Sequence, residues 1–277
     1  MTFVSLFAGI GGIDLGLERA GHTCVGQVEI DPYCQKVLAR HWPETPRISD
    51  VRDFHGHEFG PFDLLTGGYP CQPFSHAGKR AGEHDPRHLW PEVHRIICDV
   101  RPAYVLLENV PGHLSLGFGR VLGDLAESGY DAEWDCVPAS AVGAPHQRDR
   151  VWIVAYPNGD GREPAHPRVW PGVHDDLRQR AATQRRRHQL EPRPSAHVSA
   201  MADTKVECER AGLRPSEPTG QRRGRPGHGR SARHTWAVEP DVGRVAHGVP
   251  DRTHRLRALG NAVVPQVAEL IGRRLPA

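Results

Sequence analysis

The chain has 277 residues, of which 38% are hydrophobic and 25% are charged, a composition typical of a soluble globular protein with one sizeable core. It contains no run of about 18 apolar residues, which excludes a membrane span, and its first residues enter a strand-like run with no basic leader, so we expect no secretory signal. The six cysteines form no C-x-x-C pairs. They therefore indicate reduced thiols and argue against a disulfide framework or a zinc site.

The first 156 residues alternate short apolar runs with stretches of helical periodicity. We expect strands at residues 3–7, 23–29, 62–66, 103–107 and 151–155, and helices at residues 13–20, 32–41, 89–100 and 110–128. This alternation predicts an α/β fold, with a mainly parallel sheet and helices on both faces. Ligands of such sheets bind at the carboxyl ends of the strands.

The periodicity disappears over residues 157–250, which hold 17 Lys and Arg against 11 Asp and Glu, together with 11 prolines. Two interpretations stay open for this segment: a solvated, partly disordered insertion, or a small, irregular, basic surface that binds nucleic-acid phosphates. Residues 251–277 regain a helical stripe, made of Val263, Val264, Val267, Leu270 and Ile271. We expect this helix to pack back on the first domain, because it would not be stable alone.

A glycine-rich turn, Phe7-Ala8-Gly9-Ile10-Gly11-Gly12, follows the first expected strand and opens the first expected helix. Its glycines let the backbone approach a ligand, and Glu29 at the end of the next strand can accept hydrogen bonds from a ribose diol. The pyrophosphate pattern G-x-G-x-x-G is not met, because Asp14 occupies its last position. An acid there would repel phosphate, so the turn favours a nucleoside cofactor without phosphates.

A cysteine lies between two prolines in Gly68-Tyr69-Pro70-Cys71-Gln72-Pro73-Phe74-Ser75, directly after an expected strand. Cys71 should therefore lie at the carboxyl edge of the sheet, on a turn that the prolines make rigid. The plain alternative is a buried structural cysteine, but the neighbouring residues are turn-forming and polar. A reactive thiol would need local help, because its reference pKa is about 8.5.

Glu108-Asn109-Val110 ends the next strand, so the Glu108 carboxylate should face the same edge; the plain alternative is a helix cap. Arg148 and Arg150 precede the last expected strand and should lie on one side of an extended segment. Taken alone, they could equally be ordinary surface arginines.

Taken in chain order, these motifs resemble those of the DNA cytosine-5 methyltransferases, over about residues 1–156 and 252–277. The resemblance implies a Rossmann-like S-adenosylmethionine-dependent catalytic domain at 1–156, a target-recognition region at 157–250 and a C-terminal segment at 251–277 that completes the cofactor pocket. It implies these cofactor-binding residues: Phe7, Gly9, Gly11, Gly12, Glu29, Ile30, Asp50, Val51, Pro70, Asn261 and Val263. The implied catalytic residues are Cys71, Glu108, Arg148 and Arg150, with no metal.

The chemistry implied by the resemblance gives each catalytic residue a role. Cys71 attacks carbon 6 of a flipped-out cytosine, which makes carbon 5 nucleophilic enough to accept a methyl group. Glu108 contacts ring nitrogen 3 and the exocyclic amine, and Arg150 with Arg148 holds the carbonyl at carbon 2. The implied setting is a monomer acting on double-stranded DNA in the cytoplasm of a bacterial or phage-infected cell; the resemblance leaves a cognate restriction endonuclease open.

Two departures from the family pattern concern target choice. His146 stands where the arginine motif usually opens with Gln, and only Val242–Gly248 lies near the place of the motif that organises the recognition domain. A transfer-RNA cytosine-5 methyltransferase and a catalytically idle DNA-binding homologue remain alternatives, although the intact Cys71 and Glu108 argue against the second. An amino-group methyltransferase is disfavoured because its Asn/Asp-Pro-Pro-aromatic motif is missing, and no His has a spacing that suggests a thiol hydrolase.

Overall fold

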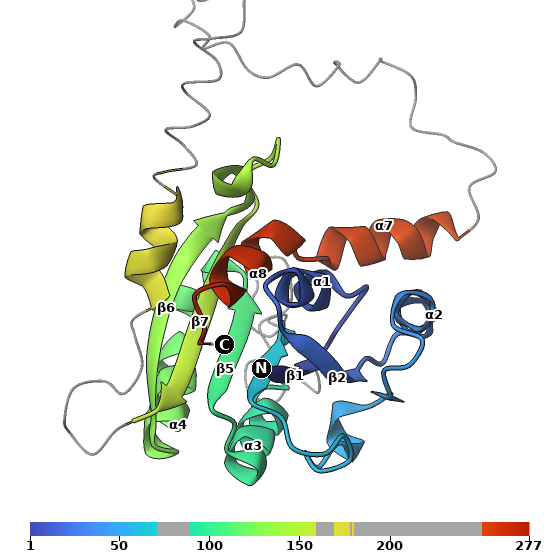
Figure 1. Cartoon of the computed structure of the whole chain (residues 1–277), viewed down its shortest axis with the longest axis horizontal. Coiled ribbons are helices and arrows are strands. Elements are labelled where there is room, and N and C mark those ends of the chain that lie inside the picture. The colour runs from blue at the N-terminus through green and yellow to red at the C-terminus, as the bar shows by residue number, and fades with distance from the viewer. Residues whose placement is uncertain (71–88, 159–168, 178, 180–250, 277) are drawn as a thin grey trace, which may run out of the picture. The chain divides into compact units, whose positions relative to one another are not determined.

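The computed structural model describes residues 1–70, 89–158, 169–177, 179 and 251–276 (Figure 1). Residues Met1–Ala181 and Gly243–Ala277 belong to one compact unit. The second unit, Ala182–Val242, lies outside the described residues, and with it most of the expected target-recognition region. None of the described helices is long and apolar enough to cross a membrane, and the four described cysteines are free.

A seven-stranded sheet forms the centre of the described unit, in the order β3-β2-β1-β4-β5-β7-β6. Neighbours from β3 to β5 run parallel, whereas β7 runs antiparallel to both β5 and β6. The expected mainly parallel sheet is thus confirmed. The strands are β1 Thr2–Leu6, β2 Thr23–Val28, β3 Arg47–Ile48, β4 Leu64–Gly67, β5 Tyr104–Asn109, β6 Tyr130–Pro138 and β7 Asp149–Pro157.

Two of these strands were not predicted. β3 has only two residues, and β6 is an edge strand in which most side chains are exposed or half-buried. Neither therefore shows an apolar run, which is the signal that marks the buried strands.

Helices cover both faces of the sheet, as predicted (Figure 1). Because strand side chains alternate, Val105 and Leu107 of β5 pack with α3 and α4, whereas Leu106 packs with α1, α8 and the helix at residues 169–177. Besides the helix at residues 169–177, the described part of the chain contains α1 Gly12–Arg19, α2 Pro32–His41, α3 Trp90–Val100, α4 Phe118–Glu127, α7 Arg252–Asn261 and α8 Pro265–Gly272. Among the described residues, 3-10 turns lie between β3 and β4 (η1 Val51–Asp53), between β5 and α4 (η4 Pro111–Ser115) and between β6 and β7 (η5 Ala139–Val142).

The single helix expected at residues 110–128 is wrong: η4 and α4 are separated at Gly117, whose φ of 82° breaks the helical path. The C-terminal stripe is also divided between two helices. Val263 and Val264 lie in the connection between α7 and α8, and Pro265 takes the first position of α8.

The expected packing of the C-terminal helix on the first domain is confirmed, since α8 lies beside α1 (Figure 1). A Cβ placed on Gly16 of α1 would lie 2.4 Å from the carbonyl oxygen of Pro265 and 2.5 Å from Cβ of Ala268. A ring nitrogen of His22 lies 2.9 Å from the carbonyl oxygen of Gly272. The helices α1 and α8 can approach this closely only because Gly16 has no side chain.

The order in which the chain adds strands to the sheet reverses at β1. The chain moves from β1 outward to β2 and β3, and then returns to place β4 on the other side of β1. The turns that follow β1, β2, β4 and β5 therefore meet at one carboxyl edge, where open α/β sheets bind their ligands.

Candidate active site

The glycine-rich turn and Glu29 lie together, as predicted. The backbone N–H of Gly9 donates to one carboxylate oxygen of Glu29 at 2.6 Å, and the N–H of Asp31 donates to the other at 2.7 Å. Glu29 is only 8% exposed; burial raises its pKa, and the two backbone hydrogen bonds oppose that rise. The carboxylate is thus held in one orientation, and each oxygen still has a lone pair that can accept a hydrogen bond from a ligand.

The backbone of the turn leaves space for a ligand. Gly9 and Gly11 have φ of 58° and 83°, a region that L side chains rarely adopt. A Cβ on Gly9 would find no neighbour closer than the carbonyl oxygen of Phe7, at 4.0 Å. A ligand can therefore approach the main chain at Gly9.

Asp14 does not act as the sequence suggested. Its side chain is fully buried behind the turn, where it accepts hydrogen bonds from Ser5 at 3.0 Å and from Gln27 at 2.8 Å. Burial raises its pKa. Because the carboxyl group does not face the ligand space, the expected repulsion of a phosphate by contact with Asp14 is wrong, and the group instead ties α1 to β1 and β2.

Three more residues expected at the cofactor, Ile30, Asp50 and Val51, lie just after the neighbouring strands β2 and β3. Asp50 caps η1 by accepting from the N–H of Arg52 at 3.0 Å, and it also pairs with the Arg52 guanidinium at 3.2 Å. Val51 is buried, whereas Ile30, next to Glu29, is 65% exposed. A large apolar side chain this exposed, at the edge of the ligand space, can cover a flat apolar group.

Cys71 itself lies outside the described residues, but the three residues before it are fixed. A Cβ on Gly68 would lie 2.8 Å from a carboxylate oxygen of Glu108. The Asn109 side chain donates to the carbonyl oxygen of Tyr69 at 3.2 Å, and the Tyr69 hydroxyl lies 2.7 Å from a ring nitrogen of His113. The end of β5 therefore holds the chain that enters Cys71.

Sequence reasoning missed Asn109 and His113 as residues that position this turn. Asn109 stood beside the quoted acid, but no pattern showed where its amide points. Tyr69 carried a signal, because a buried tyrosine hydroxyl usually finds a partner, but nothing in the spacing identified His113 as that partner.

The Glu108 carboxylate forms an ion pair with Arg150, whose Nε lies 2.8 Å from it. Glu108 is 9% exposed, and burial raises its pKa to about 7, although Arg150 and then Arg148 lower it. η4 starts after Val110 without a side-chain cap, so the helix-cap alternative for Glu108 is wrong. The site thus holds a carboxyl group that exchanges a proton near neutral pH.

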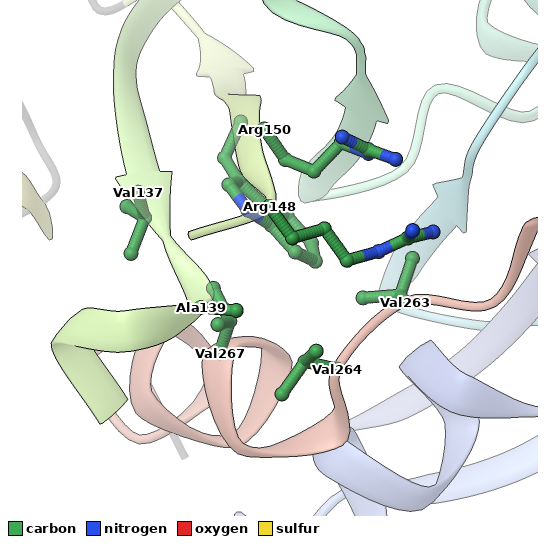
Figure 2. A pocket seen from close by; sticks show the side chains of 8 residues that line it. Val137, Ala139, Arg148, Arg150, Val263, Val264 and Val267 are labelled. Atoms are coloured by element: carbon green, nitrogen blue, oxygen red, sulfur yellow. The ribbon is translucent and has the colours of Figure 1, made fainter. Parts of the chain in front are cut away.

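Arg148 and Arg150 line one pocket and extend in a similar direction, but they meet different partners (Figure 2). Arg148 has a φ of 40°, outside the extended region, and donates to the carbonyl oxygens of Gly260 and Ala262 at 2.8 and 2.6 Å. The lining residues are Val137, Ala139, Arg148, Arg150, Trp152, Val263, Val264 and Val267. The structure therefore places Arg150 on the Glu108 carboxylate and Arg148 on the segment that contains Asn261 and Val263.

The fold is that of a Rossmann-like methyltransferase. The model of the C-5 cytosine-specific DNA methylase family matches residues 1–208, and the chain belongs to this family. The resemblance drawn from the motifs is confirmed.

Relatives of this chain are Type II methyltransferases. It is 40% identical to M.NgoMIV of Neisseria gonorrhoeae over 162 residues, which are 57% of this chain and 52% of that protein. It is 35% identical to M.MspI of a Moraxella species over 162 residues, covering 56% of this chain and 38% of that protein. The chain spans about half the length, or less, of the curated relatives that it matches.

Solved structures agree on the fold. A structure described as a DNA modification methyltransferase encoded within a prophage of E. coli aligns with a TM-score of 0.50 and 28% identity, covering 57% of this chain and 47% of that one. A Spodoptera frugiperda DNMT2 variant aligns with the same TM-score and 24% identity over 58% of this chain and 51% of that one. The latter supports the fold alone.

Proposed function

We propose that this protein methylates carbon 5 of cytosine in double-stranded DNA. The observation that carries the proposal is the Glu108–Arg150 pair, which lies against Gly68, three residues before Cys71, at the same sheet edge as Glu29. A buried acid and a cation at the strand edge that leads into a cysteine suit nucleophilic attack on a polar ring, with charge stabilisation at its nitrogen.

The residues present fit S-adenosylmethionine, which would supply the methyl group. Glu29 is oriented by the N–H groups of Gly9 and Asp31 and can accept from two ribose hydroxyls. Ile30 is exposed enough to cover an adenine face, and Asp50 lies at the end of the adjacent strand. The further residues that we assign to this pocket are Phe7, Gly11, Gly12, Val51, Pro70, Asn261 and Val263.

The reaction at cytosine follows from the side chains. The Cys71 thiolate forms a bond to carbon 6, and the electron pair displaced through the ring makes carbon 5 nucleophilic. The protonated form of Glu108, which a pKa of about 7 makes available at neutral pH, donates to ring nitrogen 3 and accepts from the exocyclic amine, while Arg150 holds the carbonyl at carbon 2. After carbon 5 has gained the methyl group, a base, for which we propose a water molecule, takes its proton; this restores the double bond and expels the Cys71 thiolate.

The target base must leave the duplex to reach this edge, at a cost of a few kcal/mol. We assign the flanking DNA contacts to residues 157–250 because of their excess of Lys and Arg. We further propose a monomer in a bacterial or phage-infected cytoplasm, with a restriction endonuclease of the same target as a partner.

The test uses S-adenosylmethionine with a tritiated methyl group, mixed-sequence duplex DNA, and digestion of the product to nucleosides. We expect label in 5-methyldeoxycytidine with the wild type and none with Cys71→Ser. Label in transfer RNA but not in DNA would mean that the substrate is transfer RNA. Label in neither, from a protein that still binds the cofactor, would indicate an idle DNA-binding homologue.

A further inference from the structure

Arg148 is bound to the end of a helix, which is an unexpected place for a residue that should contact the base. Its guanidinium donates to the carbonyl oxygens of Gly260 and Ala262, at the C-terminus of α7. The last carbonyls of a helix have no partner within the helix and carry the negative end of its dipole. A cation that donates to two of them satisfies both needs.

The geometry of Arg148 fits this contact and not a shared role with Arg150. With a φ of 40°, Arg148 departs from the β7 path, although it lies only two residues from Arg150. Burial lowers its pKa, and repulsion from Arg150 lowers it further, while Glu108 opposes both effects. The two carbonyl oxygens therefore stabilise the charged form of Arg148, whereas Arg150 is stabilised by the Glu108 carboxylate.

The segment that Arg148 holds is in contact with the cofactor turn. A Cβ on Gly12 would lie 2.7 Å from the carbonyl oxygen of Val263 and 3.2 Å from its backbone nitrogen. Residues 260–263 are thus held on one side by Arg148 and lie against Gly12 on the other. Apart from Ala258, the α7 side chains are exposed. Helix α7 contacts α2 before Ala258, where the ring of His254 stacks on Tyr33, and Arg257 lies 3.8 Å from Asp31. These contacts therefore fix residues 260–263 less directly than the contacts of Arg148 do.

We propose that Arg148 is a positioning residue that clamps residues 260–263 against the glycine-rich turn and so shapes the cofactor pocket. Arg150 alone of the two arginines then serves the base. This inference rests on the proposed function only for the identity of the cofactor, because the contacts of Arg148 do not depend on the substrate.

The experiment compares Arg148→Met, Arg148→Lys and Arg273→Met with the wild type. Methionine keeps the apolar stem and removes both hydrogen bonds, whereas the lysine ammonium keeps the charge and can reach one carbonyl. Arg273→Met is the matched control, because it removes an exposed guanidinium that pairs with Glu269 in the same C-terminal segment. The measurements are S-adenosylmethionine binding by calorimetry, and hydrogen exchange of residues 259–264 in the ligand-free protein.

We expect Arg148→Met to weaken S-adenosylmethionine binding at least tenfold and to speed exchange in residues 259–264, since hydrogen bonds to charged groups contribute strongly. Arg148→Lys should fall between Arg148→Met and the wild type, and Arg273→Met should match the wild type. In turnover, Arg148→Met should raise the KM for the cofactor more than it lowers kcat. If Arg148→Met fails to fold, the Arg148→Lys comparison decides.

Cofactor affinity within twofold of the wild type, together with unchanged exchange, would overturn the clamp. A fall in kcat alone would mean that Arg148 contacts the cytosine base, as the family resemblance implies. A wild type that binds the cofactor but transfers no methyl group would contradict the proposed function and leave the clamp to be decided by binding and exchange. A wild type that binds no cofactor would leave the decision to exchange.

Discussion

Replacing Glu108 by Gln should change how the stability of the protein depends on pH. Glutamine has the shape of the protonated acid but cannot ionise. Burial raises the pKa of Glu108 from 4.5 to about 7 in the folded protein, despite the Arg150 guanidinium at 2.8 Å. Between these two values the folded state holds a proton that the unfolded state releases, so the contribution of Glu108 to stability falls as the pH rises.

The size of the effect follows from the two pKa values. Each unit of difference corresponds to about 1.4 kcal/mol, and the full shift is therefore about 3 kcal/mol. Between pH 5 and pH 8 the wild type should lose about 2–3 kcal/mol that Glu108→Gln keeps. Other buried acids, such as Asp14 and Glu29, titrate in both proteins and cancel in the difference.

Urea unfolding of both proteins at several pH values between 5 and 8 measures this difference. Glu127→Gln, which removes an exposed carboxylate at the end of α4, is the matched control. If the difference in the free energy of unfolding between the wild type and Glu108→Gln stays constant within about 0.5 kcal/mol over this pH range, the pKa of Glu108 is not raised in the folded protein, which would refute the reasoning.

Three further changes test the same site. Arg150→Met removes the strongest influence that lowers the pKa of Glu108. When Arg150→Met is added to both the wild type and Glu108→Gln, the pH at which their free energies of unfolding change relative to each other should therefore rise. An unchanged pH would mean that the ion pair is absent in solution. Gly68→Ala places a methyl group 2.8 Å from the end of the Glu108 side chain, which can turn away, so we expect methyl transfer to fall at least tenfold with less than about 1 kcal/mol lost in urea unfolding. Gly12→Ala meets the Val263 main chain at 2.7 Å, which cannot turn away, so thermal and urea unfolding should show a loss of about 1–3 kcal/mol and calorimetry weaker cofactor binding; wild-type values would mean that the segment does not lie against the turn.

The parts of the fold that could be predicted from the sequence are those with a local signal. Strands β1, β2, β4, β5 and β7 were visible because most of their residues are buried on both faces, which gives each a short, largely apolar run. The edge strand β6 was invisible because its side chains are largely exposed or half-buried. Helix α7 was missed as a separate element because only Ala258 on it is buried, which leaves no apolar stripe.

The contacts of the site depend on the order of the strands, which no local pattern contains. Glu108 lies opposite Trp152 only because β7 inserts antiparallel beside β5, and this pairing brings Arg150 to the acid. In the same way, Arg148 reaches Gly260 across 112 positions of sequence. The motifs predicted which residues matter at the cofactor turn, but Asp14 shows that spacing alone did not tell which side of the turn a carboxylate faces.

The most direct test of the central claim, that Cys71 attacks cytosine at carbon 6, is a trapping experiment with duplex DNA that contains 5-fluorodeoxycytidine at the methylated site. Fluorine replaces the proton that must leave carbon 5, so the reaction should stop with the thiol still attached to the base. With S-adenosylmethionine present, denaturing gels and mass spectrometry should show a one-to-one protein–DNA adduct that carries one added methyl group and maps to Cys71, and Cys71→Ser should form none. A protein that methylates the unmodified DNA but forms no adduct, or forms one at another residue, would contradict the account.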